Sequence, residues 1–239
     1  MHDDRTSEPV ALVTGANRGI GAAALRALRA RGVRAVGTYR TDPAPDGGFV
    51  RMDVRSDESV QDGVAELRER FGRPSIVVCN AGVSAVDKFA RMSVERFLDV
   101  CDANAAGAIR VVNSVLSDLV AAPSSAVVLV GSLSGTHGSV GNGHYAAAKA
   151  ALGGYARALA VEHGDAGLSA MVVAPGFVDT DMLRRAGVRS RSMIVPKIPR
   201  SRFASPDEVG ELIAALTDPR ARALTNSIVH VDGGMGMGW

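Results

Sequence analysis

The chain has 239 residues, of which 46% are hydrophobic and 22% charged, and this fits a single globular α/β domain with a large core. Its formal net charge of +2 indicates neither a nucleic-acid partner nor a membrane surface. No apolar run approaches the ~20 residues of a membrane helix, the polar start carries no targeting segment, and Cys79 and Cys101 are expected to be buried free thiols, so a cytoplasmic protein is predicted.

Strands and helices are predicted in alternation along the chain. The polar residues 1–8 are expected to be disordered or loosely ordered, and the domain to span residues 9–239. Short β-branched apolar runs predict strands at Val10–Thr14, Val33–Thr38, Phe49–Met52, Ile76–Cys79, Val127–Val130, Ser169–Val173 and Ser227–Val231. Longer stretches rich in Ala, Leu and Arg predict helices near residues 19–31, 57–71, 93–121, 144–163 and 206–217. Because several strand runs are apolar without alternation and helices separate them, we predict a single-domain α/β fold with a doubly wound parallel sheet of about seven strands.

One connection is too short for a crossover helix. From Arg40 to Gly48 the chain reads Arg-Thr-Asp-Pro-Ala-Pro-Asp-Gly-Gly, and proline disrupts a helix interior. A loop or a single turn is predicted there.

The connection from the first strand to the first helix is rich in glycine. It reads Thr14-Gly15-Ala16-Asn17-Arg18-Gly19-Ile20-Gly21. The glycines permit a tight turn and close approach of the backbone to a pyrophosphate, and the helix N-terminus supplies free N–H groups and positive potential. Most glycine clusters mark plain turns, but the strand before this one and the helix after it match a dinucleotide site.

The end of the second strand indicates which dinucleotide is bound. Proteins that prefer NAD place a carboxylate there for the ribose 2′-hydroxyl, whereas this strand ends Gly37-Thr38-Tyr39-Arg40. The Arg40 guanidinium can form paired, charge-assisted hydrogen bonds with a 2′-phosphate, and Arg18 in the glycine-rich loop can approach the same phosphate. Two solvated arginines are the alternative, but their positions together favour NADP(H).

A tyrosine and a lysine are predicted to share one helix face. Tyr145 and Lys149 are four residues apart in an alanine-rich helical segment, so the phenol and the ammonium project together. A nearby positive charge lowers the pKa of a phenol, which makes it a usable proton donor to a carbonyl oxygen. An ordinary surface pair is the alternative for this dyad taken alone.

Further motifs follow other strands at the same edge of the predicted sheet. Ser132 follows the strand Val127–Val130, Asn80-Ala81-Gly82 follows the fourth strand, and Pro175-Gly176 follows the sixth. Ligands of a doubly wound sheet bind outside the carboxyl ends of its strands. The motifs therefore predict an active site at this edge.

Together these motifs resemble the signature of the short-chain dehydrogenase/reductase family, over roughly residues 9 to 239. The segments 173–182 and 231–237 are similar, more narrowly, to those of the 3-oxoacyl-acyl-carrier-protein reductases. The short link after Tyr39-Arg40 resembles an actinobacterial branch of these reductases. The resemblance implies a Rossmann fold and a nicotinamide cofactor.

The resemblance also implies roles for single residues. Tyr145 would be the general acid, Lys149 would bind the nicotinamide ribose and tune Tyr145, and Ser132 would hydrogen-bond the carbonyl oxygen. Asn104 matches an asparagine that anchors a water in a proton relay, although Ala105-Ala106 departs from the leucine and threonine that usually follow it. The cofactor would contact Asp53 and Val54 at its adenine, Val178 and Thr180 at its carboxamide, and Gly15, Asn17, Arg18, Gly19, Ile20, Gly21, Arg40, Asn80, Ala81, Gly82, Pro175 and Gly176 elsewhere. Asp53 could also be a plain helix or turn cap.

Some features near the site remain open. His144 and His137 flank the catalytic residues. A histidine next to the catalytic tyrosine could touch the substrate, but no partner is visible, so a surface or interface role is predicted for both. Residues 184–202 correspond to a mobile lid in the family, and their positive charge either attracts an anionic substrate or carrier or keeps the lid solvated. The basic residues of this segment are Arg184, Arg185, Arg189, Arg191, Lys197, Arg200 and Arg202. The family usually forms tetramers through the helices near 93–121 and 144–163.

Three functions are compatible with the sequence. The first is NADPH-dependent reduction of a 3-oxoacyl group to a 3-hydroxyacyl group on acyl carrier protein. The second is a tailoring ketoreductase or alcohol dehydrogenase for a carrier-free small ketone, such as a polyketide. The third is an NADP-binding sensor without turnover, which ranks last because all four catalytic residues are present.

The carrier protein itself is an uncertain partner. Related reductases dock this acidic protein through two arginines, one before the strand that leads to the catalytic serine and one after the catalytic helix. The matching stretches here are residues 119–126, without a basic residue, and residues 163–167, which hold Asp165. We therefore expect the carrier to add little to substrate recognition, unless the basic segment 184–202 compensates.

Overall fold

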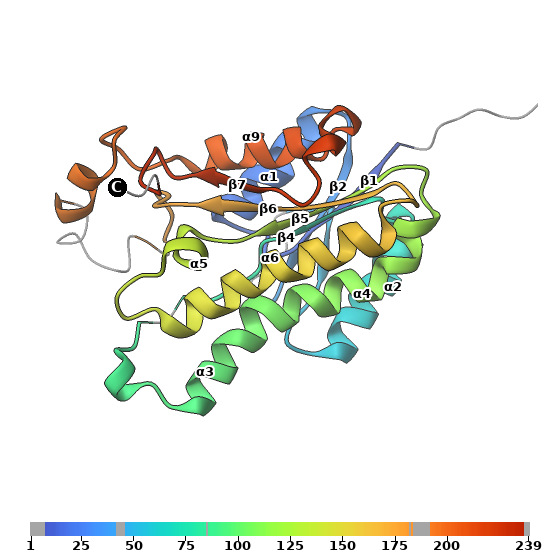
Figure 1. The fold of residues 1–239 in the computed structure, drawn as a ribbon. Helices are drawn as coiled ribbons and strands as arrows, with labels where there is room; N and C mark the ends of the chain where they lie inside the picture. The colour runs from blue at the N-terminus through green and yellow to red at the C-terminus, as the bar shows by residue number, and fades with distance from the viewer. Residues whose placement is uncertain (1–7, 42–45, 85, 182, 184–191, 237–239) are drawn as a thin grey trace, which may run out of the picture.

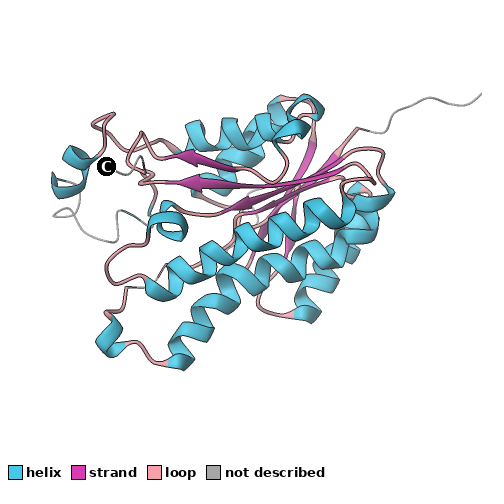
Figure 2. Ribbon diagram, viewed as in Figure 1, coloured by secondary structure: helices cyan, strands magenta, loops and turns pink. Residues whose placement is uncertain are grey.

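A single parallel sheet forms the centre of the molecule (Figures 1 and 2). The computed structural model describes residues 8–41, 46–84, 86–181, 183 and 192–236. In these residues seven strands follow the order β3-β2-β1-β4-β5-β6-β7, and all neighbours are parallel. The strands are β1 (Val10–Val13), β2 (Arg34–Tyr39), β3 (Phe49–Arg51), β4 (Ile76–Cys79), β5 (Ser125–Val130), β6 (Leu168–Pro175) and β7 (Ile228–Val231). Because the strand order reverses between β1 and β4, the predicted doubly wound sheet is confirmed.

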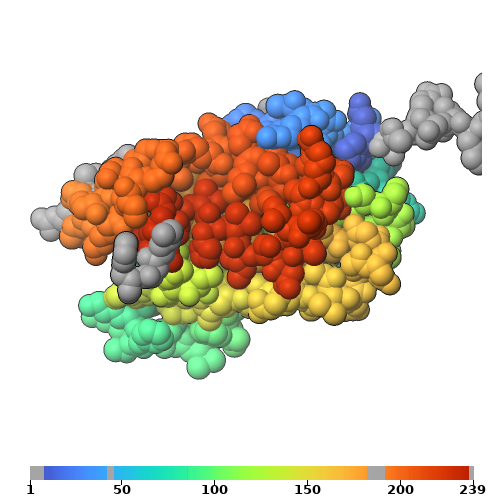
Figure 3. Space-filling model, turned by 45° about the horizontal axis from the view of Figure 1, so that its top comes forward, coloured from blue at the N-terminus to red at the C-terminus, as the bar shows by residue number. Residues whose placement is uncertain are grey.

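Helices cover both faces of the sheet. Helices α1 (Gly19–Ala30) and α9 (Pro206–Leu216) pack against each other on one face. Helices α2 (Asp57–Phe71), α4 (Gly107–Ala121) and α6 (Gly143–His163) lie on the other face (Figure 1). In Figure 3 the orange and red C-terminal segments form one continuous surface beside the blue N-terminal residues, so segments from both ends of the chain complete the same domain.

The strands are buried on both faces, which explains their apolar runs. Leu12 of β1 belongs to the core cluster beneath α2, α4 and α6, whereas its neighbours Ala11 and Val13 belong to the cluster beneath α1 and α9. All three side chains are completely buried. A strand enclosed in this way needs apolar residues at every position instead of every second one.

The connection from β2 to β3 contains no helix in its described residues, 40–41 and 46–48. Tyr39 and Arg51 are paired in parallel, so the chain returns to the sheet without a crossover helix. The prediction of a loop holds for these residues, while residues 42–45 lie outside the described part.

The helix predicted over residues 93–121 is interrupted. Helix α3 (Val94–Cys101) is followed by a π-helical turn (Asp102–Ala106) before α4 begins. Helix α5 (Leu133–His137), which directly follows Ser132, was not predicted because five residues are too few to show a helical period. The π-helical turn and α5 both lie at the carboxyl edge of the sheet, where the motifs converge.

The remaining expectations concern the cysteines and the chain start. Cys79 is buried, but Cys101 is only partly buried, and both are free thiols. Within the described part of the chain, no helix has the length and hydropathy to cross a membrane. Residues 1–7 of the expected loose start lie outside the described residues, whereas Glu8 forms an ion pair with Arg34 at 3.2 Å.

Candidate active site

The glycine-rich loop leaves the N-terminus of α1 open to a ligand. Arg18 occupies the N-cap position but makes no side-chain cap hydrogen bond, and the first turn of α1 holds no acidic residue. Gly15 and Gly19 have φ values of 61° and 57°, a left-handed conformation that disfavours other residues. A Cβ atom at Gly21 would lie 2.4 Å from both Asn80 Nδ2 and Gly15 O. The free N–H groups and the lack of side chains fit a bound pyrophosphate.

Asn80 supports this loop from the neighbouring strand. Its Nδ2 donates to the carbonyl oxygens of Thr14 at 3.0 Å and Gly15 at 3.1 Å. In return, Thr14 Oγ1 accepts hydrogen bonds from the backbone N–H groups of Asn80 and Ala81, at 2.9 and 3.0 Å. Asn80 therefore holds the loop in shape, and Thr14 is a site residue whose side-chain role the sequence did not reveal.

A cavity of about 270 Å³ extends from the loop across the edge of the sheet. Both Arg18 and Arg40 line it, as the expected 2′-phosphate site requires. The other predicted residues that line it are Gly15, Asn17, Gly19, Ile20, Asp53, Val54, Asn80, Ala81, Gly82 and Thr180. The lining residues that were not predicted include Thr38, Tyr39, Thr41, Met52, Arg55, Val83, Ala103 and Asp181. The cavity is thus enclosed by the segments that the sequence placed around a dinucleotide.

Asp53 and Arg55 have structural partners at the same cavity. Asp53 Oδ1 accepts a hydrogen bond from the backbone N–H of Arg55 at 3.0 Å, so Asp53 caps a turn, which was the alternative considered for it. Asp53 also lines the cavity, where it was expected to contact the adenine. The Arg55 guanidinium forms an ion pair with Asp99 and another with Asp102, the latter at 3.3 Å. Because both aspartates are distant in sequence, only the fold could show that Arg55 connects the cavity to the π-helical turn.

Ser132, Tyr145 and Lys149 meet at the ends of β5 and α6. Ser132 follows β5 and caps α5, since its Oγ accepts the N–H of Ser134 at 3.1 Å. Its hydroxyl is also a hydrogen-bonding neighbour of the Tyr145 hydroxyl, which lowers the Tyr145 pKa. Lys149 Nζ lies 5.8 Å from the centroid of the Tyr145 ring and donates to the carbonyl oxygen of Val130 at 2.8 Å. The predicted catalytic residues are therefore brought together.

The pKa of Tyr145 differs from the expectation. Burial raises the pKa of Tyr145 above its ordinary value, and the hydrogen bond with Ser132 lowers it by less. The net lowering expected for the Tyr145 pKa is therefore wrong for this structure, because burial is the largest influence on it, and the Lys149 ammonium donates to Val130 O. Burial lowers the pKa of Lys149 itself to about 8. A phenol that keeps its proton is suited to act as an acid.

Asn104 lies in the π-helical turn and is almost fully buried. Its Nδ2 donates to the carbonyl oxygens of Val83 and Val100, each at 2.9 Å, and its Oδ1 accepts the N–H of Val83 at 3.2 Å. A Cβ atom at Gly82 would lie only 2.4 Å from this Oδ1. Both amide protons of Asn104 are thus engaged, which leaves only acceptor atoms for a water.

The residues predicted to contact the carboxamide follow β6. Gly176 packs so closely that a Cβ atom would lie 2.8 Å from Asp232 Cα. Val178 is buried, pairs with Ala204 in a β-bridge, and does not line the cavity. Thr180 does line it, and its Cγ2 lies 3.5 Å from the position of a Cβ atom at Gly19. Of this segment, Thr180 is the residue placed to meet a ligand of the cavity.

The two histidines near the site differ. The surface or interface role predicted for His144 is wrong, because its side chain is completely buried. His137 is exposed, its Nδ1 lies 2.8 Å from Thr136 Oγ1, and its ring packs edge-on against that of His230.

The basic segment 184–202 is described only in part. Arg184, Arg185, Arg189 and Arg191 lie outside the described residues. Arg202 forms two hydrogen bonds to the carboxylate of Glu208, at 2.8 and 2.6 Å. Because Glu208 lies in the first turn of α9, Arg202 stabilises the start of that helix. Lys197 and Arg200 are exposed and add positive charge to the surface here.

The two stretches expected to lack docking arginines lie away from the site. Residues 119–126 lead into β5 and residues 163–167 lead into β6, so both are at the amino edge of the sheet, opposite Ser132 and Tyr145. Arg222 lies beside both stretches, and its guanidinium donates hydrogen bonds to the carbonyl oxygens of Ser125 and Gly167. These stretches cannot border the active site of their own chain, and Arg222 supplies a cation that sequence reasoning missed.

Comparisons with known proteins agree with this geometry. A family model described as enoyl-(acyl carrier protein) reductase matches residues 15–236. The chain is 38% identical over 228 residues to the 3-oxoacyl-[acyl-carrier-protein] reductase MabA of Mycobacterium avium, covering 95% of this chain and 89% of that protein. It is 33% identical over 237 residues to the reductase FabG of Escherichia coli, covering 95% and 97%.

A solved structure shows the same fold. The ligand-free aldohexose dehydrogenase of Thermoplasma acidophilum superposes with a TM-score of 0.92, over 97% of this chain and 95% of that one. At 23% sequence identity, this likeness concerns the architecture alone.

Proposed function

The chain belongs to the short-chain dehydrogenase/reductase family of nicotinamide-dependent oxidoreductases, and on this premise we propose that it is an NADPH-dependent ketoreductase. Its reaction would convert a 3-oxoacyl group to a 3-hydroxyacyl group. The observation that carries the proposal is the convergence of Ser132, Tyr145 and Lys149 at the sheet edge that also bears the cavity.

The choice of NADPH rests on charge. Arg18 and Arg40 line the same cavity, and the described end of β2 supplies no carboxylate to it. Guanidinium groups bind phosphate oxygens through paired hydrogen bonds. The uncapped N-terminus of α1 would hold the pyrophosphate, and the segment Asp53–Val54 would lie against the adenine.

The chain's own residues would handle the substrate oxygen and its proton. When bound, the nicotinamide supplies a hydride for the carbonyl carbon. The Ser132 hydroxyl would hold the carbonyl oxygen, and Tyr145 would give its proton to that oxygen. A charged Lys149 beside Tyr145 would stabilise the phenolate that is left. Asn104 would hold a water for reprotonation through its acceptor atoms.

Two substrate classes fit this chemistry. The similarity to MabA and FabG supports a 3-oxoacyl thioester, with acyl carrier protein as a possible partner. The alternative is a carrier-free or polyketide-derived ketone, which fits the absence of arginines from 119–126 and 163–167, where Arg222 is the cation that the fold brings in. Either substrate would be held and protonated by the same four residues while NADPH supplies the hydride. Because all four catalytic residues are present, a non-catalytic NADP sensor is the least consistent function.

A substrate panel tests the proposal. NADPH absorbance is followed with a 3-oxoacyl carrier thioester, a short coenzyme A thioester and a cyclic ketone. Oxidation of NADPH that depends on one of these ketones, with a hydroxyl product, is expected. If none of the three is reduced while NADPH binds, the ketoreductase proposal fails and the sensor gains support.

We also propose that the protein is a cytoplasmic homotetramer. Exposed Leu98 and Val161, on α3 and α6, support an interface on the helices that the family uses. Sedimentation should give a mass near four times 24.7 kDa, and a monomeric mass would contradict it.

A further inference from the structure

His144 is buried directly beside the proposed proton donor. Its side chain is 0% exposed, and its Nδ1 accepts the backbone N–H of Tyr145 at 2.8 Å. In a neutral imidazole, the nitrogen that accepts a hydrogen bond carries no proton, so the proton is on Nε2. The ring therefore presents an N–H donor on the side away from Tyr145.

That donor faces a carboxylate without bonding to it. His144 Nε2 lies 3.4 Å from Asp87 Oδ2, and it has no hydrogen-bond partner in the described part of the protein. A typical N–H···O hydrogen bond is about 2.9 Å long. Since an unsatisfied buried donor is unfavourable, a small approach of Asp87 would be stabilising.

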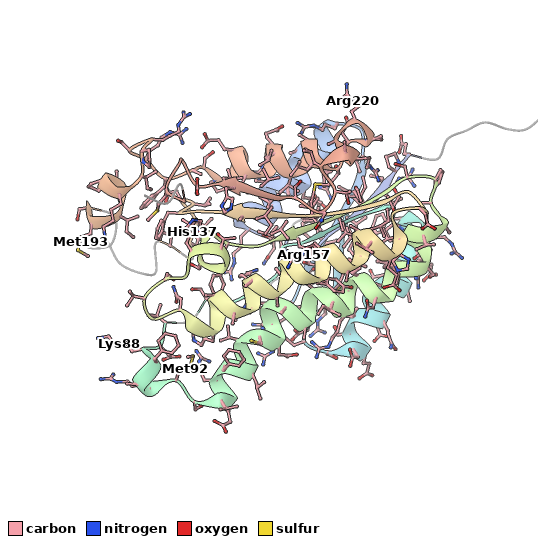
Figure 4. The ribbon with its side chains drawn as sticks, in the orientation of Figure 1. Lys88, Met92, His137, Arg157, Met193 and Arg220 are labelled. Atoms are coloured by element: carbon pink, nitrogen blue, oxygen red, sulfur yellow. The ribbon has the colours of Figure 1, made fainter. Side chains whose placement is uncertain are left out.

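Asp87 belongs to a segment that crosses the start of α6. Its backbone N–H donates to the carbonyl oxygen of Gly141 at 2.8 Å, and its Oδ2 accepts from Arg96 Nε at 3.3 Å. Figure 4 shows Lys88 and Met92 of this segment at the same end of the molecule as His137 and Met193. Residues 86–92 and 138–143 continue from the carboxyl ends of β4 and β5, and therefore from the edge that bears the catalytic group.

The two segments fit closely because of glycines. A Cβ atom at Gly141 would lie 3.1 Å from Val86 Cγ1, and one at Gly143 would lie 2.7 Å from the Phe89 ring. Apolar side chains remain open to solvent on both segments: Val86 is 71% and Val140 is 93% exposed. Together they form an apolar surface next to the first turn of α6, which carries Tyr145.

We infer that His144 and Asp87 are positioning residues that hold segment 86–92 against α6 and so determine how a long apolar substituent of the ketone is bound beside Tyr145. The inference rests on the proposed ketone reduction. His144 joins the two parts, since one ring nitrogen holds the backbone of Tyr145 and the other faces the substrate segment. A small ketone would not reach this surface, so its reduction would not depend on the pair.

The test compares two ketones in four variants. His144→Ala, Asp87→Ala, the double variant and His144→Gln are assayed with a long-chain 3-oxoacyl pantetheine thioester and with a small cyclic ketone. If Asp87 closes on the Nε2–H group when the long substituent is bound, each alanine variant loses a hydrogen bond to a charged group in the bound state, so KM for the long thioester should rise about tenfold. In Asp87→Ala, which leaves the contact of His144 with the Tyr145 backbone intact, the values for the cyclic ketone and kcat for both ketones should change little. The double variant should be no worse than either single one, because the two side chains act as a pair.

Controls separate positioning from folding. His144→Gln places an amide N–H near the position of Nε2 and should restore much of the KM. His163→Gln, on the same helix but distant from the site, should leave kinetics unchanged. Melting temperatures identify any variant that fails to fold. If His144→Ala fails to fold, the kinetics of His144→Gln and Asp87→Ala test the inference.

Two outcomes would overturn the inference. One is an equal effect of Asp87→Ala on both ketones, and the other is additive effects of the two alanine substitutions. These outcomes are distinct from failure of the proposed function, in which the unmodified protein reduces neither ketone.

Discussion

Two opposing influences act on Tyr145, and burial is the larger one. It keeps the phenol protonated by raising its pKa, while the hydrogen bond with Ser132 partly compensates. Tyr145→Phe removes the proton and keeps the ring, so turnover should fall roughly 10²–10⁴-fold with NADPH binding nearly unchanged. Tyr155→Phe, on the same helix, removes only a hydroxyl that donates to Asn113 Oδ1 at 2.8 Å and should stay active. Near-normal turnover of Tyr145→Phe, measured by NADPH absorbance, would contradict the mechanism.

Lys149 is expected to make the proposed reaction sensitive to alkaline pH. Burial lowers its pKa from 10.5 to about 8, so the ammonium loses its proton at a lower pH than an exposed lysine. If the charged form supports Tyr145, kcat/KM should fall as pH rises through about 8. A profile of the unmodified enzyme that stays flat from neutral pH to well above that value would show that the ammonium is not needed.

Arg40 is expected to discriminate between the two nicotinamide cofactors. Arg40→Asp replaces a phosphate-binding cation by an anion, which should raise KM for NADPH sharply and narrow or reverse the preference over NADH. Arg220→Asp makes the same charge change at a side chain that is 91% exposed, and should leave the preference intact. Equal use of both cofactors by the unmodified enzyme would exclude the assigned role.

At the scale of elements, the π-helical turn is held to the loop after β4 by Asn104. Gly82→Ala would place a Cβ atom 2.4 Å from Asn104 Oδ1, so the side chain that binds Val83 must move. Overpacking of this kind costs about 1–3 kcal/mol, and roughly 2–4 °C of Tm is lost per kcal/mol in a domain of this size. Activity should fall as well, because Lys149 Nζ lies 3.6 Å from the same position.

Gly153→Ala is the matched control in α6. There a Cβ atom would meet only Arg157 Nη1 and Ile228 Cδ1, both at the ordinary distance of 3.5 Å. Alanine is more favourable than glycine in a helix by up to about 1 kcal/mol, so this variant should melt at a higher temperature. If Gly82→Ala raises Tm as Gly153→Ala does, the close packing at Gly82 does not limit stability.

At the scale of the whole molecule, the fold separates the active site from the stretches that could dock a carrier. Residues 119–126 and 163–167 lie at the opposite edge of the sheet, so a carrier would reach them only on a second copy of the chain. One 3-oxoacyl group is therefore compared on carrier protein and on a pantetheine mimic at low and high salt. Similar kcat/KM values are expected, whereas a large advantage for the carrier that salt abolishes would restore the carrier-bound assignment.

Much of the architecture was determined by the sequence alone. Apolar runs at β1, β4 and β5 and glycines at 15, 19 and 21 reflect local requirements, namely burial on both faces and a turn without side chains. Such requirements act over a few residues, so they can be recognised without a structure. The sheet edge that gathers Ser132, Tyr145 and Lys149 follows from strand direction and helical spacing.

Only the tertiary structure decided the features that depend on contacts between distant segments. The pairing of His144 with Asp87, the ion pairs of Arg55 with Asp99 and Asp102, and the π-helical turn around Asn104 leave no local pattern. The raised pKa of Tyr145 is likewise a consequence of burial among residues brought together by folding. Spacing places two side chains on one helix face, but the distance between charges, and hence which group holds the proton, is determined by the packed structure.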